Sequence, residues 1–325
     1  MVGAKVSFDR GNMMYIIKWR EKMRRIKLQS AVLTAVLTFA AAAHPAMGEE
    51  AQVMTGNLME VPSAGETVNY DESWLYASAS EIHSGQAVLY RAGGSMEAPG
   101  RKNFTVCVNA GHGTAGGSNY QTMSHPDGTP KVTGGTNAEG AVYSTAISSG
   151  MAFADGTPEA SATLMTAMAL KEYLLQDGYD VLMIRESDDV QLDNIARTVM
   201  ANNCADIHIA IHFDSTQSDK GVYFCSVPDV ASYRQMEPVA SHWQEHMALG
   251  QALVQGLEAE GFWLFGDGTL PMDLTQTSYS TIPSVDIEVG DGASDHSQEA
   301  CAMRARGLKE GVGIYFNGKA QDSTD

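Results

Sequence analysis

Basic residues are scarce in this sequence, which has 21 lysines and arginines against 39 aspartates and glutamates in 325 residues. The formal net charge is -18 at pH 7. Proteins that bind nucleic acid neutralise phosphates with lysine and arginine, so this balance argues against a nucleic-acid partner. It also argues against electrostatic adsorption to an anionic surface, and acidity alone suffices to keep such a protein in solution.

Cysteine is scarce as well. The four cysteines stand isolated among apolar neighbours and form no CxxC pair, so a zinc site built from thiolates is not expected. In an exported protein Cys204 and Cys225 are candidates for a disulfide, because they lie at the ends of adjacent predicted strands. The alternative is that Cys107, Cys204, Cys225 and Cys301 are all small buried hydrophobic residues.

The apolar stretch 31–43 has 13 residues, well short of the roughly 20 that a membrane-spanning helix needs. Basic residues precede it from Lys18 to Lys27, and small residues follow it up to Gly48. This pattern is typical of a secretory signal peptide, with Met23 as an alternative start. We therefore expect residues 1–48 to be removed and the protein to act outside the cytoplasm, in the periplasm, cell wall or medium. A retained membrane anchor is the alternative.

Removal of residues 1–48 would take away eight basic and two acidic residues, leaving 13 basic against 37 acidic and a net charge of -24. The sequence also has no internal repeat, so a solenoid or repeat-type wall-binding module is not indicated. Residues 49–100 are acidic and rich in Gly, Ser and Glu, which predicts a linker or lead-in that contributes one strand at most. Residues 320–325 are expected to form a short tail.

Between residues 101 and 319 apolar runs and amphipathic stretches alternate. Strands are predicted at 104–109, 180–185, 206–213, 221–227 and 283–289, and helices at 158–176, 189–202, 238–260 and 296–311. This rhythm predicts a single α/β domain with a mostly parallel or mixed sheet and helices on both faces. The long segment 113–157 breaks the rhythm and has little apolar periodicity. We interpret it as an insertion that covers the functional site and is mobile without substrate.

Two histidines follow predicted strands at positions where ligands bind in α/β sheets. His112 comes just after the strand 104–109, between two glycines. In "ADIHIAIHFDS" the isoleucines alternate onto one face, which leaves His212 on the other face at the carboxyl end of the strand. The two histidines can therefore meet at one edge of the sheet.

Glu159 lies in the first turn of the predicted helix 158–176. A glutamate there often only complements the helix dipole. However, a helix that follows a strand also begins near the carboxyl edge, so this carboxylate can reach His112 and His212. One glutamate and two histidines form a three-ligand zinc set that leaves a fourth position for water, as in catalytic zinc sites.

Glu288 is the candidate for acid–base chemistry. In "IPSVDIEVGDG" the residues Val285, Ile287 and Val289 share one face, so Asp286 and Glu288 point to the other, towards the expected cavity. A buried carboxylate without a positive partner is energetically costly, which favours a functional role over a structural one.

These blocks, "VNAGHG", "GTPEASATLMTAMALKEYL", "ADIHIAIHFDS" and "PSVDIEVG", occur in this order. Together with "LMIRESDDVQLDNIARTVMANN" they resemble the zinc-dependent N-acetylmuramoyl-L-alanine amidases, which cleave peptidoglycan. The resemblance covers about residues 104–317 and implies a zinc-exopeptidase-like sandwich. It implies one Zn²⁺ held by His112, Glu159 and His212, with Glu288 as the catalytic glutamate.

The sequence departs from the family pattern in two places. Thr114 follows His112-Gly113, where the family usually has another glycine and a nearby aspartate, and the path from His112 to Glu159 is unusually long. The end of the last strand, "VGDGASD", also lacks the usual Gly-Phe and Asn. The long path leaves His125 and Glu139 open as alternative metal ligands.

A rival metal motif lies in the predicted helix 238–260. "HWQEH", with His242, Glu245 and His246, fits the inverted zinc-peptidase pattern H-x-x-E-H. The pattern fixes only three positions, and we expect both histidines on the solvent side of the helix.

The expected function is therefore an exported zinc hydrolase that cuts the amide between N-acetylmuramic acid and L-alanine in peptidoglycan or muropeptides, without a stable membrane span and as a monomer. Zinc would polarise the amide, and Glu288 would transfer the proton. Two alternatives remain: a metallopeptidase or other amide hydrolase acting on a different peptide, and a non-catalytic wall-binding or regulatory protein of the same fold.

Overall fold

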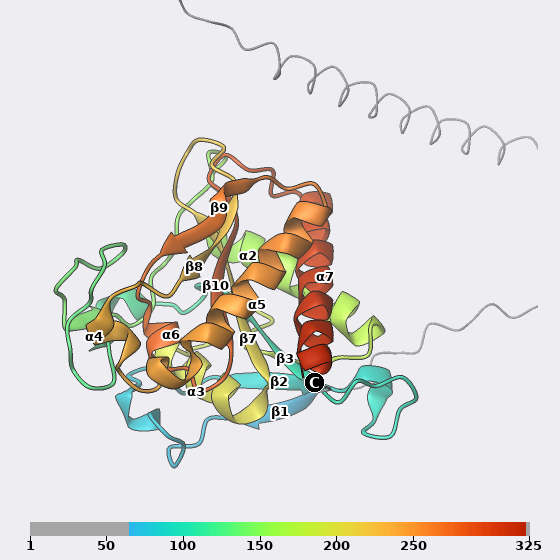
Figure 1. Ribbon diagram of the computed structural model, residues 1–325, viewed down its shortest axis with the longest axis horizontal. Helices are drawn as coiled ribbons and strands as arrows, with labels where there is room; N and C mark the ends of the chain where they lie inside the picture. Colours follow the sequence, from blue (N-terminus) through green and yellow to red (C-terminus); the bar gives the residue numbers. More distant parts are fainter. Residues whose placement is uncertain (1–64, 323–325) are drawn as a thin grey trace, which may run out of the picture. The chain divides into compact units, whose positions relative to one another are not determined.

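The computed structural model describes residues 65–322. The chain forms an α/β domain, in which helices cover both faces of one large sheet (Figure 1). Its strands are β1 (Glu66–Asn69), β2 (Gln86–Tyr90), β3 (Thr105–Ala110), β4 (Gln121–Met123), β5 (Tyr143–Thr145), β6 (Asp180–Met183), β7 (Ile207–Asp214), β8 (Val222–Ser226), β9 (Leu264–Pro271) and β10 (Ser284–Asp291). Its α-helices are α2 (Glu159–Gln176), α3 (Asn194–Cys204), α4 (Ala231–Arg234), α5 (Val239–Ala259), α6 (Thr275–Tyr279) and α7 (Gln298–Asp322).

The large sheet has eight strands in the order β1-β2-β6-β3-β7-β10-β8-β9. The four central strands, β6, β3, β7 and β10, run parallel to one another. Antiparallel pairing joins β2 to β6 on one side and β8 to β10 on the other. The predicted fold class, a mixed and mostly parallel sheet between helices, is therefore confirmed.

The main hydrophobic core lies between the sheet and helices α2, α5 and α7. Ile207, Ile209 and Ile211 of β7 contribute to it, as the alternation in the sequence predicts. The other face of the sheet packs against α3, where a second core includes Leu182 and Met200. Each central strand is thus buried on both sides, which explains its nearly continuous apolar sequence.

Helices α5 and α7 cross the front of the sheet side by side (Figure 1). Glycines allow their backbones to touch. A Cβ atom at Gly311 of α7 would lie 2.5 Å from the Cα of Leu253 in α5, and one at Gly256 would lie 2.2 Å from the carbonyl oxygen of Gly307. Larger residues at these positions would push the helices apart and open the core beneath them.

The folded part of the chain begins earlier than expected. Residues 66–69 and 86–90, from the predicted lead-in, add two strands to the sheet rather than one at most. Strand β9 and the short helices α4 and α6 were also not predicted, and α7 continues to Asp322, through the start of the expected tail. The predicted signal peptide, residues 1–48, lies outside the described residues.

Within residues 65–322, no helix combines the length and the hydropathy that crossing a membrane requires.

The segment 113–157 is docked onto the domain, contrary to the expectation that it has little to dock with. Its anchor is Asp273, a fully buried residue just after β9. Lys131 and His125 form ion pairs with the Asp273 carboxylate at 2.9 and 3.2 Å. The backbone N–H of Val132 donates to the same carboxylate at 2.6 Å, and the Thr133 hydroxyl donates to it as well. Polar contacts therefore act together with apolar ones, since Ile147 and Phe153 of the segment are also buried.

These contacts outweigh the effect of burial and hold the pKa of Asp273 well below its usual range, so the anchor is charged at neutral pH. Lys131 is itself buried and is the only lysine or arginine in the segment. Trypsin can therefore cut the segment only after Lys131, and only when the anchor opens.

We predict that Asp273→Ala releases the segment, because it leaves the Lys131 ammonium buried without its partner. Loss of one member of a buried ion pair typically costs about 3–5 kcal/mol. Limited trypsin digestion followed by mass spectrometry should show rapid cleavage after Lys131 in this variant and resistance in the wild type. Asp267→Ala, in the exposed part of β9, is the matched control. Equal cleavage of the wild type would show that the segment is mobile.

Candidate active site

The candidate site lies at the carboxyl edge of the central strands. After β3 the chain passes through α2 to β6 on one side, and then through α3 to β7 on the other, so the strand order reverses at β3. Ligands of α/β sheets bind at such reversal points. Here a cavity of about 480 Å³ opens between the strand ends, the end of the segment 113–157 and the residues that precede and begin α6.

A sharp turn at the end of β3 positions His112. Its φ of 63° is left-handed, a conformation that costs a residue with a side chain about 1–2 kcal/mol. Two buried arginines hold the turn. Arg185 donates to the carbonyl oxygens of Ala110 and Gly111 at 3.0 and 2.8 Å, and Arg197 donates to those of Ala110 and His112 at 2.9 and 2.5 Å. These bonds fix the direction in which the imidazole points.

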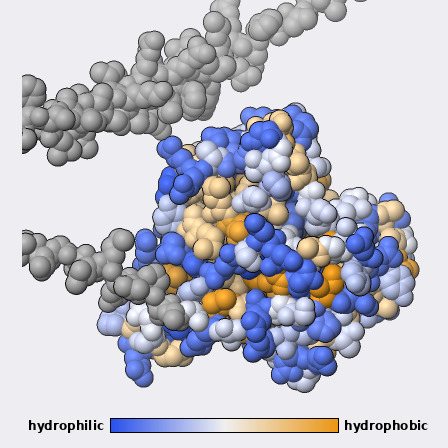
Figure 2. Space-filling model, turned by 180° about the vertical axis from the view of Figure 1, so that it is seen from behind, coloured by the Kyte–Doolittle hydropathy of each residue, from blue (hydrophilic) through white to orange (hydrophobic). Residues whose placement is uncertain are grey.

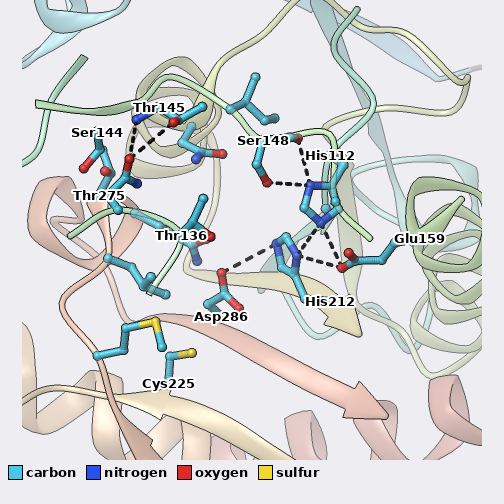
Figure 3. A pocket seen from close by; sticks show the side chains of 18 of the residues that line it. His112, Thr136, Ser144, Thr145, Ser148, Glu159, His212, Cys225, Thr275 and Asp286 are labelled. Carbon is cyan, nitrogen blue, oxygen red and sulfur yellow. Dashed lines mark hydrogen bonds and ion pairs between the residues drawn. The ribbon is translucent and has the colours of Figure 1, made fainter. Parts of the chain in front are cut away.

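His112, Glu159 and His212 converge on one point (Figure 3). The Nε2 atom of His112 lies 2.8 Å from Oε1 of Glu159 and 3.0 Å from Nδ1 of His212. The Nδ1 atom of His212 lies 3.2 Å from the same glutamate oxygen. The structure thus brings together the three residues that the sequence predicted as metal ligands.

In each imidazole, the outer nitrogen, which points away from the cluster, faces an acceptor. The Nδ1 atom of His112 lies 2.9 Å from the carbonyl oxygen of Ser148, which can only accept, so Nδ1 carries the proton. The Nε2 atom of His212 lies 3.5 Å from the carboxylate of Asp286. Such partners orient ligating histidines and raise their basicity. The inner nitrogens, His112 Nε2 and His212 Nδ1, therefore face each other and the Glu159 carboxylate.

Glu159 is held by backbone groups at the start of α2. Its Oε1 accepts from the N–H of Phe213 at 3.0 Å, and its Oε2 accepts from the N–H of Met151 at 2.9 Å. Gly150 passes close by with φ +78°, and a Cβ atom there would lie 2.7 Å from Glu159 Oε2 and from the His112 ring. Only glycine fits at this position.

Charge is unbalanced in the cluster, since three carboxylates surround two imidazoles. Burial disfavours the charged form of Glu159, but hydrogen bonds from His112 and His212 prevail and hold its pKa well below the usual range. Burial also disfavours protonated His212, but the carboxylates of Asp286, Glu159 and Glu288 raise its pKa to about 10. The group thus holds more carboxyl groups than imidazoles, and a bound cation would take the place of the proton on His212.

These residues fit a zinc ion. Two lone pairs facing each other at 3.0 Å repel unless a cation or a shared proton lies between them. Ligand atoms bound to a tetrahedral zinc at about 2.0–2.1 Å lie roughly 3.3 Å apart, close to the separations found here. Two histidines and one glutamate are also a known catalytic zinc set.

Glu288 and Asp286 line the same cavity from β10, as the alternation predicts. The Oε2 atom of Glu288 is buried and has no hydrogen-bond partner in the described structure. Burial, together with the nearby carboxylates of Asp286, Glu159 and Asp214, raises the pKa of Glu288 well above its usual value. A carboxyl group in this state can hold a proton and exchange it with a reactant in the cavity.

The alternative ligands lie elsewhere. Both ring nitrogens of His125 have partners, Thr129 at 3.0 Å and Asp273 at 3.2 Å, so it belongs to the anchor. Glu139 is exposed and belongs to neither metal-competent group in the described part of the chain.

The inverted motif on α5 also does not form a metal site in residues 65–322. His246 is buried, contrary to the expectation that it faces solvent, and its Nδ1 accepts from the N–H of Ser284 at 2.9 Å. Ser284 is the first residue of β10, at the opposite end of the strand from the cavity.

All four cysteines are free, so the candidate disulfide between Cys204 and Cys225 is absent. Cys107, Cys225 and Cys301 are buried, whereas Cys204 is partly exposed. Cys225 lines the cavity, a position that no sequence pattern predicted. The backbone partners of the site, Ser148 and Met151, were also not predicted.

Comparison with known proteins agrees with this geometry. The family model described as N-acetylmuramoyl-L-alanine amidase matches residues 106–305, more than half of the chain. The chain therefore belongs to the N-acetylmuramoyl-L-alanine amidase family. A search of curated protein sequences finds no match.

Two solved structures share the fold. The amidase Ami1 from Mycobacterium smegmatis aligns with a TM-score of 0.54 and 20% identity, over 66% of this chain and 98% of its own. Ami1 from Mycobacterium abscessus, in its apo form, aligns with a TM-score of 0.53 and 21% identity, over 66% of this chain and 99% of its own.

We predict that zinc binding depends on the converging histidines and not on the motif in α5. His212→Ala leaves two protein ligands, too few to hold zinc tightly. After dialysis against metal-free buffer, elemental analysis should find one zinc per chain in the wild type and at least a ten-fold lower content in His212→Ala. His242→Ala is the control and should keep its zinc. The reverse result would favour the inverted motif.

Proposed function

We propose that this protein is a zinc-dependent N-acetylmuramoyl-L-alanine amidase that acts on peptidoglycan outside the cytoplasm. The observation that carries the proposal is the convergence of His112, Glu159 and His212 at 2.8–3.2 Å beside the buried, unpartnered oxygen of Glu288. Membership of the amidase family supports the reaction, and the secretory pattern at residues 1–48 supports the compartment.

The three ligand residues would hold one Zn²⁺, which supplies Lewis-acid chemistry: it polarises an amide carbonyl and lowers the pKa of water to about 7. The other steps, orientation of the histidines and transfer of the proton, depend on residues of the chain. With the ion bound, Asp286 and the Ser148 carbonyl would orient His212 and His112 from the side away from the ion. Glu288 takes a proton from the attacking water at its free oxygen and returns it to the departing nitrogen of L-alanine.

The cavity wall around the site offers many polar groups to a substrate. Ser144, Thr145, Thr136 and Asn137 line it from the segment 113–157, and Thr275 lines it from α6 (Figure 3). Such groups suit the hydroxyls and amides of a glycopeptide better than a purely apolar peptide. The docked segment would therefore form part of the substrate-binding wall.

The direct test is incubation with purified peptidoglycan, with and without a chelator, followed by identification of the new termini. An amidase releases stem peptides that begin with L-alanine, and the chelator stops their release. Internal peptide fragments would instead identify a metallopeptidase. Binding to the wall without any new terminus would identify a non-catalytic protein of the same fold.

We predict that Glu288→Gln separates zinc binding from turnover. The amide keeps the size of the carboxylate but cannot accept and return a proton, and acid–base catalysis typically contributes about 10²–10⁴ in rate. The rate of L-alanine termini release should fall by at least 100-fold, while zinc content is unchanged. Glu299→Gln, on the exposed first turn of α7, is the control. Loss of zinc would make Glu288 a ligand, and full activity would exclude it as the base.

A further inference from the structure

A second group of metal-competent side chains lies beside the proposed zinc site. Cys225, Asp286 and Glu288 each offer one ligand atom, and these atoms lie within 4.8 Å of one another. The three residues belong to neighbouring antiparallel strands, in which Phe224 pairs with Ile287 and Tyr223 pairs with Glu288. One step further along this register Cys225 comes opposite Asp286. The pairing of the two strands therefore places these three side chains next to one another.

The thiol of Cys225 is placed to meet a ligand from the cavity. Its residue is only 5% exposed, yet it lines the cavity together with Asp286 and Glu288. Figure 3 shows its sulfur on the same side of the sheet as Asp286 and His212. A merely structural cysteine would be expected to face the hydrophobic core, as Phe224, its neighbour in β8, does.

The oxygen atoms of the group also lack a complete set of partners. Glu288 Oε2 is buried without a hydrogen bond in the described structure. The carboxylate of Asp286 forms one ion pair, with the Nε2 atom of His212 at 3.5 Å. Two other basic side chains line the cavity, but Lys131 is paired with Asp273 at 2.9 Å, and Arg197 donates to backbone carbonyl groups. The group thus concentrates two carboxyl groups and a thiol at the cavity wall, with His212 as the neighbouring basic side chain.

We propose that Cys225, Asp286 and Glu288 form a second, weaker site for a thiophilic divalent cation such as Zn²⁺ or Cd²⁺, and that a cation bound there inhibits the enzyme. One sulfur and two oxygens suit a borderline or soft cation better than Mg²⁺ or Ca²⁺. Binding replaces the proton of the thiol, which passes to solvent.

Inhibition follows because the second site shares Glu288 with the catalytic apparatus, and this part of the proposal rests on the proposed function. A Glu288 oxygen that binds a cation cannot accept a proton from water. The first equivalent of zinc would therefore support activity, and an excess would suppress it.

The test loads the protein with one equivalent of Zn²⁺ and then titrates it with Cd²⁺ while recording ultraviolet absorption. Binding through a thiolate produces a sulfur-to-cadmium charge-transfer band. We expect the band to grow up to one added equivalent in the wild type and to be absent in Cys225→Ser, which should keep the first equivalent of zinc. Cys204→Ser is the matched control, because Cys204 is the partly exposed cysteine, and it should keep the band.

The second measurement is release of L-alanine termini against zinc concentration. The concentration of Zn²⁺ that halves activity should rise at least ten-fold in Cys225→Ser and remain unchanged in Cys204→Ser. Cys225→Ala serves if the serine variant does not fold. A band that persists in the Cys225 variants, or one lost in Cys204→Ser, would overturn the proposal. Failure of the proposed function would appear separately, as no activity at one equivalent.

Discussion

The site depends on how the chain leaves β3. Three consecutive carbonyl groups, those of Ala110, Gly111 and His112, accept hydrogen bonds from two buried guanidinium groups. An arginine has five donors in a rigid fork and can hold several carbonyls at once, so Arg185 and Arg197 act as a fixed template for the turn. Their bonds offset the cost of the left-handed conformation at His112. The imidazole is thereby oriented before any metal arrives, which reduces the entropy lost on binding.

The residues of the cluster were predictable because each stands at a position marked by a strong local pattern. His212 and Glu288 lie in the carboxyl-terminal halves of strands whose apolar residues alternate, and Glu159 begins a long helix after a proline. The carboxyl ends of parallel strands must meet at one edge, so side chains far apart in sequence could be placed together. The groups that contact these residues were harder to predict from the sequence. The Ser148 carbonyl and the Met151 N–H are backbone groups, and the side chains at those positions do not indicate that the backbone contacts the site.

The elements that sequence patterns missed lack the usual signals. Strand β1 pairs only with β2 and is largely exposed, and β9 contains two glycines and ends in a proline. All five residues of α6 are buried, yet four of them are polar, so the segment resembles a loop. The docking of the segment 113–157 was missed for a related reason. Its polar anchor is one carboxylate, Asp273, far along the chain, and charge pairing at such a distance leaves no periodicity to detect.

Figure 2 shows the face turned away in Figure 1, where hydrophilic residues predominate and hydrophobic ones form only scattered patches.

The segment 113–157 has two parts with different roles. Residues 121–145 form a small hairpin tied to Asp273, whereas residues 148–151 supply the groups that hold His112 and Glu159. The hairpin and residues 148–151 are thus held by different contacts, so the hairpin can change without moving the backbone beside His112 and Glu159. A single loop thus combines residues of the cavity wall with the backbone groups that orient the candidate metal ligands.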